Sequence, residues 1–320
     1  AGLCARFPRA QRECGVSVQD HGLLRTAARA LHCLERPAVG DCLAGHRHGA
    51  AVVGQGRERD GAVGGRVACV SLAVSIVSHG HGAQVQALLQ SLARTSSDSV
   101  QRVWITHNCP GPLPVTVSWP FEVRSLHNSV PQGFGANHNQ AFRHEQACAR
   151  PAEFFAVLNP DLDWTQDPFA PLLCAAAQPR AGCAYPVQVT PKAQRQDHQR
   201  SLPTPASLLR RYVAPDHRLP PRIDWVNAAC LLFPAVVFRD IGGFDEKFYM
   251  YCEDVDLCLR LQLQGYLLME TEEATVVHEA QRASHQQWRH CMWHLASLWR
   301  LWHSDAYRDY RLQRKPCQKS

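Results

Sequence analysis

Residues 242–260 read GGFDEKFYMYCEDVDLCLR, and this segment decides which fold and chemistry we expect of the chain. The two glycines that open it permit a tight turn with positive φ. Apolar spacing then predicts a helix from about Glu253 to Gln264, ended by Gly265. The first turn of this helix is therefore acidic.

The acidic residues of that first turn allow two interpretations. Carboxylates at a helix start are favoured by the macrodipole, so Glu253, Asp254 and Asp256 could simply cap the helix. Glu253 and Asp254 are adjacent, however, and point in different directions. One can orient the structure while the other faces a cleft as a general base.

Short β-rich runs alternate with helical stretches from residue 70 onward. This alternation predicts an α/β fold with a mainly parallel sheet, in which ligands bind at the carboxyl ends of the strands. We expect strands at Leu72–Val77, Val103–Thr106, Phe121–Val123, Phe154–Leu158 and Ala274–His278, and helices at Val85–Leu92 and Ala136–Cys148.

Carboxylates follow the strand at Phe154–Leu158. Asp161 and Asp163 come directly after this apolar run, at the expected sheet edge, where a hard cation could bridge to a diphosphate. An Asn-Pro-Asp turn before a helix explains the same residues. His278 ends the last predicted strand and could complete a metal site or contact a diphosphate, although a lone histidine is more often structural.

The bulk composition narrows the class of protein. With 45% hydrophobic and 19% charged residues, the chain is expected to fold. The net charge of +6 is unevenly placed and comes without a zinc-finger, RNP-like or basic heptad pattern, so we expect no nucleic-acid partner. The 14 scattered cysteines predict reduced, mostly buried thiols. No segment reads as a transmembrane helix or a signal peptide.

We expect three parts along the chain. Residues 1–66 form a poorly defined extension, either flexible or not native to the fold. Residues 67–283 form the catalytic domain, with a nucleotide-binding half at about 70–165 and an acceptor half at about 166–283, the latter including a long loop at Thr190–Arg222 that could act as a lid. Residues 284–320 form a basic, aromatic helix and tail.

The motifs together resemble family 2 glycosyltransferases, in particular the rhamnosyltransferase-like branch, over roughly residues 70–304. The block from Gly243-Phe244-Asp245-Glu246 through Glu253-Asp254-Val255-Asp256 to Arg260 is the specific part of the resemblance. It is joined by Val74 to Ser78, residues 133–139 (GFGANHN), Asn159-Pro160-Asp161, Gly265 and His278.

The resemblance implies a GT-A fold and roles for individual residues. Asp254 is the expected general base with Glu253 beside it, and Asp161 and His278 are the expected ligands of Mg²⁺ or Mn²⁺. The residues assigned by resemblance to nucleotide or substrate binding are Ser78, His79, His107, Asn108, Gly135, Asn139, Asp163, Asp256 and Arg260.

The implied function is inverting transfer of a sugar, L-rhamnose above all, from a nucleoside diphosphate (dTDP-rhamnose) to a glycan or polyprenyl-linked acceptor in cell-surface polysaccharide synthesis. The implied location is cytoplasmic, peripheral to the inner face of the cytoplasmic membrane. His107 stands where the family usually has aspartate, and Ala228 where it usually has glycine, which leaves base and sugar choice open. The alternative is a catalytically silent nucleotide-sugar-binding or scaffolding protein of the same fold.

The tail beyond Ser284 predicts one helix with an aromatic stripe. Tryptophan combined with arginine is typical of a helix at a membrane interface. A stripe of this kind packs a core equally well, so we expect the helix to dock through it on the catalytic domain, with membrane contact as the alternative. The stripe consists of Trp288, Met292, Leu295, Trp299 and Trp302.

Overall fold

The computed structural model describes residues 70–111, 118–208, 222–278 and 288–314. The chain divides into two units, Ala1–Ala68 and Cys69–Ser320, and all described residues belong to the second. The expected extension at residues 1–66 therefore lies outside the described residues. So do parts of the expected loop and tail, at 209–221 and 284–287.

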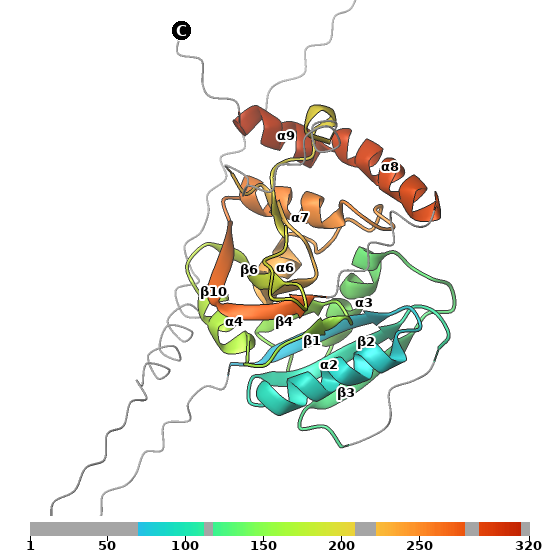
Figure 1. The fold of residues 1–320 in the computed structure, drawn as a ribbon, viewed down its shortest axis with the longest axis vertical. Helices are drawn as coiled ribbons and strands as arrows, with labels where there is room; N and C mark the ends of the chain where they lie inside the picture. Colours follow the sequence, from blue (N-terminus) through green and yellow to red (C-terminus); the bar gives the residue numbers. More distant parts are fainter. Residues whose placement is uncertain (1–69, 112–117, 209–221, 279–287, 315–320) are drawn as a thin grey trace, which may run out of the picture. The chain divides into compact units, whose positions relative to one another are not determined.

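Strands and helices alternate along the described chain (Figure 1). In chain order they are β1 (Leu72–Ser78), α2 (Gly82–Thr95), β2 (Val100–His107), β3 (Glu122–His127), α3 (Phe134–Gln146), β4 (Phe154–Leu158), β5 (Leu162–Asp163), α4 (Phe169–Ala176), β6 (Ala181–Val189), β7 (Gln199–Arg200), β8 (Trp225–Val226), β9 (Cys230–Pro234), α6 (Ala235–Asp240), α7 (Glu253–Leu263), β10 (Leu267–His278), α8 (Trp288–Trp302) and α9 (Asp305–Arg314).

One eight-stranded sheet, in the order β3-β2-β1-β4-β9-β6-β10-β5, forms the centre of the fold. Strands β1 to β4 pair in parallel, and β6 pairs in parallel with β10. Strands β9 and β5 run antiparallel to their neighbours. The expected α/β architecture with a mainly parallel sheet, flanking helices and C-terminal helices is confirmed.

Helices cover both faces of this sheet, because alternate residues of each central strand point to opposite sides. Leu72, Val74 and Ile76 of β1 pack in one core with the apolar faces of α2 and α4. Ala73 of β1 lies in the second core, with side chains of α3, α6 and α7. Full burial of each leucine or isoleucine in these cores contributes about 1.5–3 kcal/mol.

The turn and helix expected from residues 242–265 are present. Gly242 and Gly243 have φ of 80° and 66°, which side chains with a Cβ rarely adopt. Helix α7 ends at Leu263, and Gly265 follows with φ of 84°, the left-handed conformation that commonly closes helices. The amide of Tyr266 donates to the carbonyl of Leu261 and completes this end.

The structure departs from the sequence predictions mainly at the edges of elements. The segment expected as one long loop contains β7, because Gln199 and Arg200 pair with residues beyond the loop, at Trp225 and Val226. The predicted strand at Ala274–His278 is the end of the longer β10. Strands β6 and β9 were not predicted, since both are largely buried on both faces and show no regular alternation of apolar and polar residues.

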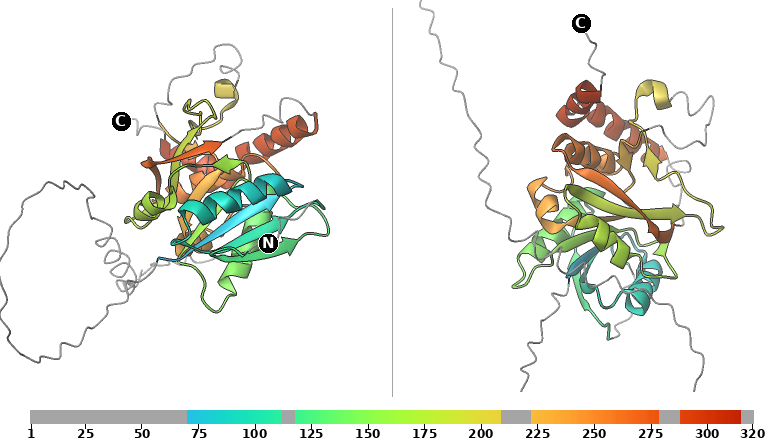
Figure 2. Two further views of the ribbon diagram at one scale, coloured as in Figure 1. Left: turned by 60° about the horizontal axis from the view of Figure 1, so that its bottom comes forward. Right: turned by 90° about the vertical axis from the view of Figure 1, so that its left-hand side faces the viewer.

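The tail forms two helices, α8 and α9, beside α7 (Figures 1 and 2). The prediction that α8 docks through its aromatic stripe is wrong for four of the five stripe residues. Trp288, Met292, Leu295 and Trp299 are exposed. The helix packs instead through the face that carries Ser297, Leu298 and Leu301. Among the described residues, no helix combines the length and the apolar character needed to cross a bilayer.

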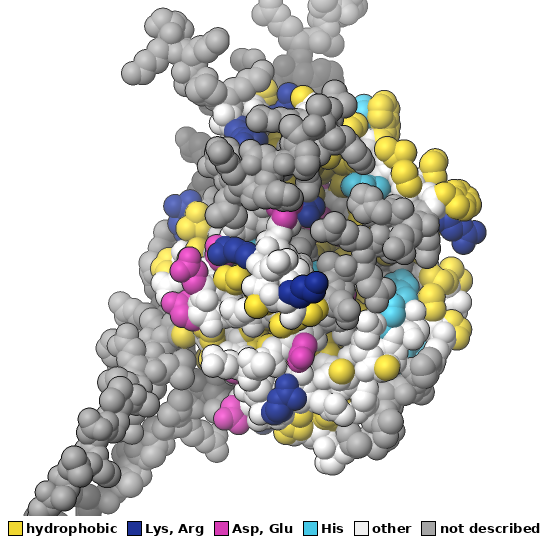
Figure 3. Space-filling view, in the orientation of Figure 1, with side chains coloured by type: hydrophobic (Ala, Val, Ile, Leu, Met, Phe, Trp, Pro, Cys, Tyr) yellow, Lys and Arg dark blue, Asp and Glu magenta, His cyan; other side chains and the backbone are white. Residues whose placement is uncertain are grey.

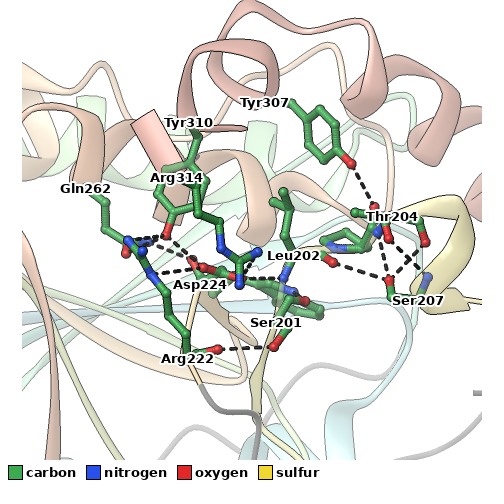
Figure 4. A network of polar contacts seen from close by, with 12 residues as sticks. Ser201, Leu202, Thr204, Ser207, Arg222, Asp224, Gln262, Tyr307, Tyr310 and Arg314 are labelled. Atoms are coloured by element: carbon green, nitrogen blue, oxygen red, sulfur yellow. Dashed lines mark hydrogen bonds and ion pairs between the residues drawn. The ribbon is translucent and has the colours of Figure 1, made fainter. Parts of the chain in front are cut away.

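A buried carboxylate fastens α9 to the strands of the small β7–β8 sheet (Figure 4). Asp224 is fully buried and accepts hydrogen bonds from the hydroxyl of Tyr310 at 2.9 Å and from the backbone amide of Leu202 at 2.6 Å. It also forms ion pairs with Arg314 at 2.9 Å and with Arg222 at 3.4 Å. The tail is therefore part of the fold rather than an appendage.

We expect Asp224→Ala to lower the free energy of unfolding by about 1–3 kcal/mol, because it leaves the buried Leu202 amide and Tyr310 hydroxyl without their acceptor and the partly exposed Arg314 without its ion-pair partner. Urea unfolding at neutral pH measures this loss. The control is Asp309→Ala in α9. It removes an exposed carboxylate that pairs with Arg308 at 3.2 Å. Equal losses for the two variants would contradict the role of Asp224.

Candidate active site

The strands of the sheet bring the polar strand ends together. Strands β1, β2, β3, β4, β6 and β10 all point the same way, so Ser78, His107 and His278 end at one edge. The turn after β4 starts at this edge, where the amide of Asn159 donates to the carbonyl of Ala229 at 2.8 Å. The sequence prediction that these ends share one edge is correct.

Asp161 and His278 face each other across this edge. The antiparallel pairing of β5 with β10 places His278 opposite Leu162, and Nε2 of His278 lies 3.6 Å from Oδ1 of Asp161. Both side chains are largely shielded, with 10% and 14% of their surface exposed. Gln196 donates a hydrogen bond to the backbone carbonyl of His278 and holds the strand end in place.

The two side chains fit a divalent cation. Burial lowers the pKa of His278, although the Asp161 carboxylate opposes this shift, so the imidazole is neutral and offers a lone pair. One carboxylate and one imidazole suit Mn²⁺ better than Mg²⁺, which prefers oxygen ligands. Within the described ranges, no three His, Cys, Asp or Glu side chains gather to hold a metal alone, so diphosphate oxygens or water would supply further ligands.

Glu253 and Asp254 begin α7 after a strained approach. Tyr251 and Cys252 have φ of 71° and 64°, and non-glycine residues held in this region cost of order 1–3 kcal/mol each. Such strain clusters at functional sites. Glu253 is buried with one carboxylate oxygen, Oε2, that has no hydrogen-bond partner among the described residues, whereas Asp254 is half-buried.

The environment separates the two carboxylates into a neutral acid and a charged base. Burial, followed by the neighbouring Asp254 charge, raises the pKa of Glu253 well above its usual range. Burial also raises the pKa of Asp254 to about 6, while backbone hydrogen bonds and the positive charge of Arg200 oppose the rise. At neutral pH Asp254 is therefore ionised, with a pKa close to the working range of a general base.

A short backbone path connects Asp254 to the turn that carries Asp161. A hydrogen bond from the backbone of Ala228 reaches the Asp254 carboxylate. Ala229, the next residue, accepts the hydrogen bond from Asn159 that was described above. The expected base is thus connected, at the junction of β4, β9 and α7, to the turn that carries Asp161.

Three predicted nucleotide-binding residues form a second group with Ser78 at the ends of β1 and β2. Asn108 Nδ2 lies 3.2 Å from Nε2 of His79, and Oδ1 of Asn108 accepts from the amide of Gln132 at 2.7 Å. His107 stacks on His127 with ring centroids 4.6 Å apart. Burial lowers the pKa of both His79 and His107, so these two imidazoles are neutral at neutral pH.

The other predicted binding residues make contacts that shape the site. Asn139 clamps Phe244 through two backbone hydrogen bonds, at 2.8 and 3.0 Å. Gly135 lies so close to Phe244 that a Cβ would come within 2.5 Å of it. Arg260 binds Asp256 at 2.7 Å and the carbonyls of Ile241 and Gly243. Asp163 turns towards α2, where it accepts from Ser91 at 2.8 Å.

Asn139, Asp256 and Arg260 hold the turn at 242–246 against α3 and α7, whereas Asp163 fastens β5 to α2. The roles of this whole group in substrate binding stay predictions. Arg200 was missed by sequence reasoning. It lies in the segment expected as a loop, a Pro-, Gln- and Arg-rich stretch in which nothing distinguishes one arginine from the others. Only the pairing of β7 with β8 brings its charge to Asp254.

Arg200 leads to a prediction about pH. Transfer should fall as pH drops through about 6, because Asp254 must be deprotonated to accept a proton. Because Arg200 holds the pKa of Asp254 down, Arg200→Gln should move this acid limb to higher pH. Initial rates from acid to neutral pH measure the limb, with Lys192→Gln, an exposed cation on the preceding turn, as control. If the acid limb of Arg200→Gln stays at the pH of the parent chain, the electrostatic interaction of Arg200 with Asp254 is contradicted.

Known proteins give a consistent comparison. No family model matches the chain. It is 27% identical to an N-acetylglucosaminyl-diphospho-decaprenol L-rhamnosyltransferase of Mycobacterium tuberculosis over 294 residues, which covers 78% of this chain and 95% of that protein. It is 25% identical to the rhamnosyltransferase WbbL of Escherichia coli over 243 residues, which covers 71% of this chain and 90% of that protein.

Solved structures of glycosyltransferases also align with the chain. Staphylococcus aureus TarS 1-349 in complex with UDP-GlcNAc aligns over 75% of this chain and 71% of its own, with a TM-score of 0.47 and 11% identity. GalNAc-T7 with UDP, GalNAc and Mn²⁺ aligns over 65% of this chain and 43% of its own, with a TM-score of 0.45 and 12% identity. The sequence relatives agree with the resemblance drawn from the motifs: over most of its length, the chain is similar to proteins named as rhamnosyltransferases.

Proposed function

We propose that the chain is an inverting, metal-dependent glycosyltransferase that moves a sugar from a nucleoside diphosphate to a hydroxyl group in the synthesis of a cell-surface glycan. The observation that carries this proposal is the junction of β4, β9 and α7. There the backbone from Ala228 to Ala229 connects a half-buried base, Asp254, to the turn that carries Asp161, and Asp161 faces His278 in a pair that fits a divalent cation.

Each of these side chains has a separate role in the proposed reaction. Asp254 accepts the proton of the acceptor hydroxyl as its oxygen attacks the anomeric carbon. The bond from that carbon to the diphosphate oxygen breaks in the same step, so the configuration inverts and no covalent enzyme intermediate forms. A cation held by Asp161 and His278 would supply positive charge for the departing diphosphate. Glu253 is buried and protonated, so it places no second negative charge beside Asp254.

The donor we propose is dTDP-rhamnose, in keeping with the names of the relatives. Its nucleotide would lie at the ends of β1 and β2, against His79, His107 and Asn108. Burial keeps both histidines neutral. The nucleobase of the donor would therefore contact uncharged hydrogen-bonding groups at a position where the family usually has an aspartate. That difference makes the choice of nucleotide the first property to measure.

The acceptor we propose is a glycan on a polyprenyl carrier, by analogy with the decaprenol-linked substrate named for the mycobacterial relative. Such a carrier keeps its acceptor sugar at a bilayer, so we place the enzyme at the inner face of the cytoplasmic membrane, in contact with it through α8. The exposed tryptophans of that helix support this placement.

The test is a panel of nucleotide sugars incubated with the purified chain, an acceptor on a short polyprenyl diphosphate, and Mn²⁺, with release of nucleoside diphosphate as the readout. We expect release from dTDP-rhamnose that requires the acceptor and stops with a chelator. Binding of nucleotides without any release would identify a silent nucleotide-sugar-binding protein. Release that survives chelation would remove the metal from the proposal.

A further inference from the structure

Helix α8 leaves a continuous apolar face in contact with solvent. Trp288, Met292, Leu295 and Trp299 follow one another at spacings of four, three and four residues, so they line one side of the helix. Their exposed fractions are 75%, 56%, 57% and 66%. Figure 3 shows hydrophobic side chains gathered along the rim where α8 lies. Soluble monomers rarely expose an apolar patch of this kind without a partner for it.

A cavity of about 850 Å³ opens beside the end of this apolar face. It lies between the turn at 242–247 and the junction of α8 with α9, and Trp299 belongs both to its lining and to the apolar face. Lys247, Arg300 and His303 also line it. The cavity and the apolar face therefore form one continuous surface.

Two basic side chains of this lining, Lys247 and Arg300, are available to an anion. Within the residues that the structure describes, no side-chain hydrogen bond or ion pair holds Lys247 or Arg300. Two of the three acidic groups of the lining are paired with arginines, and the third, Asp245, has a backbone amide as its hydrogen-bond donor. Asp256 accepts from Arg260 at 2.7 Å, Asp305 pairs with Arg308 at 2.9 Å, and Asp245 accepts from the backbone amide of Lys247 at 3.0 Å.

We propose that this surface binds an anionic bilayer, with the apolar face of α8 inserted among the headgroups and the cavity holding a phospholipid phosphate through Lys247 and Arg300. Tryptophan prefers the interface between headgroups and acyl chains, and basic side chains beside it attract anionic lipid. The inference rests on the proposed function for its purpose, which is to bring the site to an acceptor carried by lipid.

Vesicle sedimentation tests the proposal with the full chain and without any sugar donor. The vesicles are phosphatidylcholine alone, or phosphatidylcholine and phosphatidylglycerol in equal parts. We expect strong binding only to the anionic vesicles. The double variant Lys247→Gln/Arg300→Gln should bind them on the order of tenfold more weakly. Trp288→Ser/Leu295→Ser, on the exposed face, should also lose binding, since the inserted apolar area shrinks.

The matched control is Arg150→Gln/Lys192→Gln, which removes two exposed charges elsewhere and should bind like the parent chain. An equal loss in this control would show only a general effect of net charge and would overturn the phosphate site. Equal binding to both kinds of vesicle would overturn it too, as would displacement from anionic vesicles by millimolar inorganic phosphate, which would indicate a site for soluble phosphate. Since no donor is present, failure here is distinct from failure of sugar transfer.

Discussion

Asp254→Asn is expected to lower kcat of sugar transfer by about 10³-fold, because a positioned general base typically contributes 10²–10⁴-fold. The amide keeps the shape of the side chain but cannot accept the proton of the acceptor hydroxyl. Affinity for the nucleoside diphosphate should be unchanged, since the nucleotide lies at the other strand ends. Initial rates at saturating donor, together with calorimetric titration of the nucleotide, measure both quantities.

The unfolding temperature distinguishes Asp254→Asn, a variant that lacks its base, from a variant that is inactive because it is less stable. Because burial raises the pKa of Asp254 to about 6 in the folded chain, its ionisation costs stability as pH rises through that value. The amide removes this cost, so the unfolding temperature at pH 7.5 should equal or exceed that of the parent chain. Asp240→Asn, at an exposed ion pair with Arg239, is the matched control and should keep full activity. Undiminished transfer by Asp254→Asn would remove the base assignment.

Asp161→Ala is expected to weaken Mn²⁺-dependent binding of the nucleoside diphosphate by about a hundredfold, because the cation loses its carboxylate ligand. Binding measured without metal should change little. Titration of Mn²⁺ followed by electron paramagnetic resonance reports the same loss without any turnover. His278→Ala should act in the same direction, since its imidazole lies 3.6 Å from Asp161.

The neighbouring carboxylate provides the control for this prediction. Asp163 follows Asp161 by two residues, but its side chain accepts hydrogen bonds from Ser91 and from the amide of Trp164. Asp163→Asn should therefore leave Mn²⁺ affinity nearly intact. If Asp163→Asn and Asp161→Ala lose Mn²⁺ equally, the structure has assigned the wrong carboxylate.

The sequence predicts the fold well where local chemistry and tertiary structure agree. The double glycine and Gly265 permit positive φ in the turn and at the helix end, and all three adopt it in the structure. Alternation of strands and helices was sufficient to predict a mainly parallel sheet. Strands β6 and β9 escaped prediction because a fully buried strand shows neither alternation nor helical spacing.

The tail shows how periodicity alone can mislead. Five aromatic or apolar residues at helical spacing predict a buried face, yet α8 packs through Ser297, Leu298 and Leu301 instead. A sequence pattern identifies an apolar side of a helix but not what covers it. Here the apolar side is exposed rather than packed on the core, and we propose a lipid surface as its partner.

Some residues of the candidate site could be grouped from the sequence, and others could not. Residues at strand ends, such as Asp161 and His278, could be grouped from sequence because parallel strands end at one edge. Arg200 could not, since its approach to Asp254 depends on the pairing of β7 with β8 across a long segment. Asn139 and Arg260 belong to the recognisable motif, but their contacts with the turn at 242–246 became apparent only in three dimensions.

The anomeric configuration of the product tests the central claim most directly. The purified chain is incubated with dTDP-rhamnose, Mn²⁺ and a polyprenyl-diphosphate glycan, and the new linkage is examined by NMR. The account predicts one transferred sugar per nucleoside diphosphate released, with a configuration opposite to that of the donor. A product that retains the donor configuration, or no product from any nucleotide sugar, would contradict it.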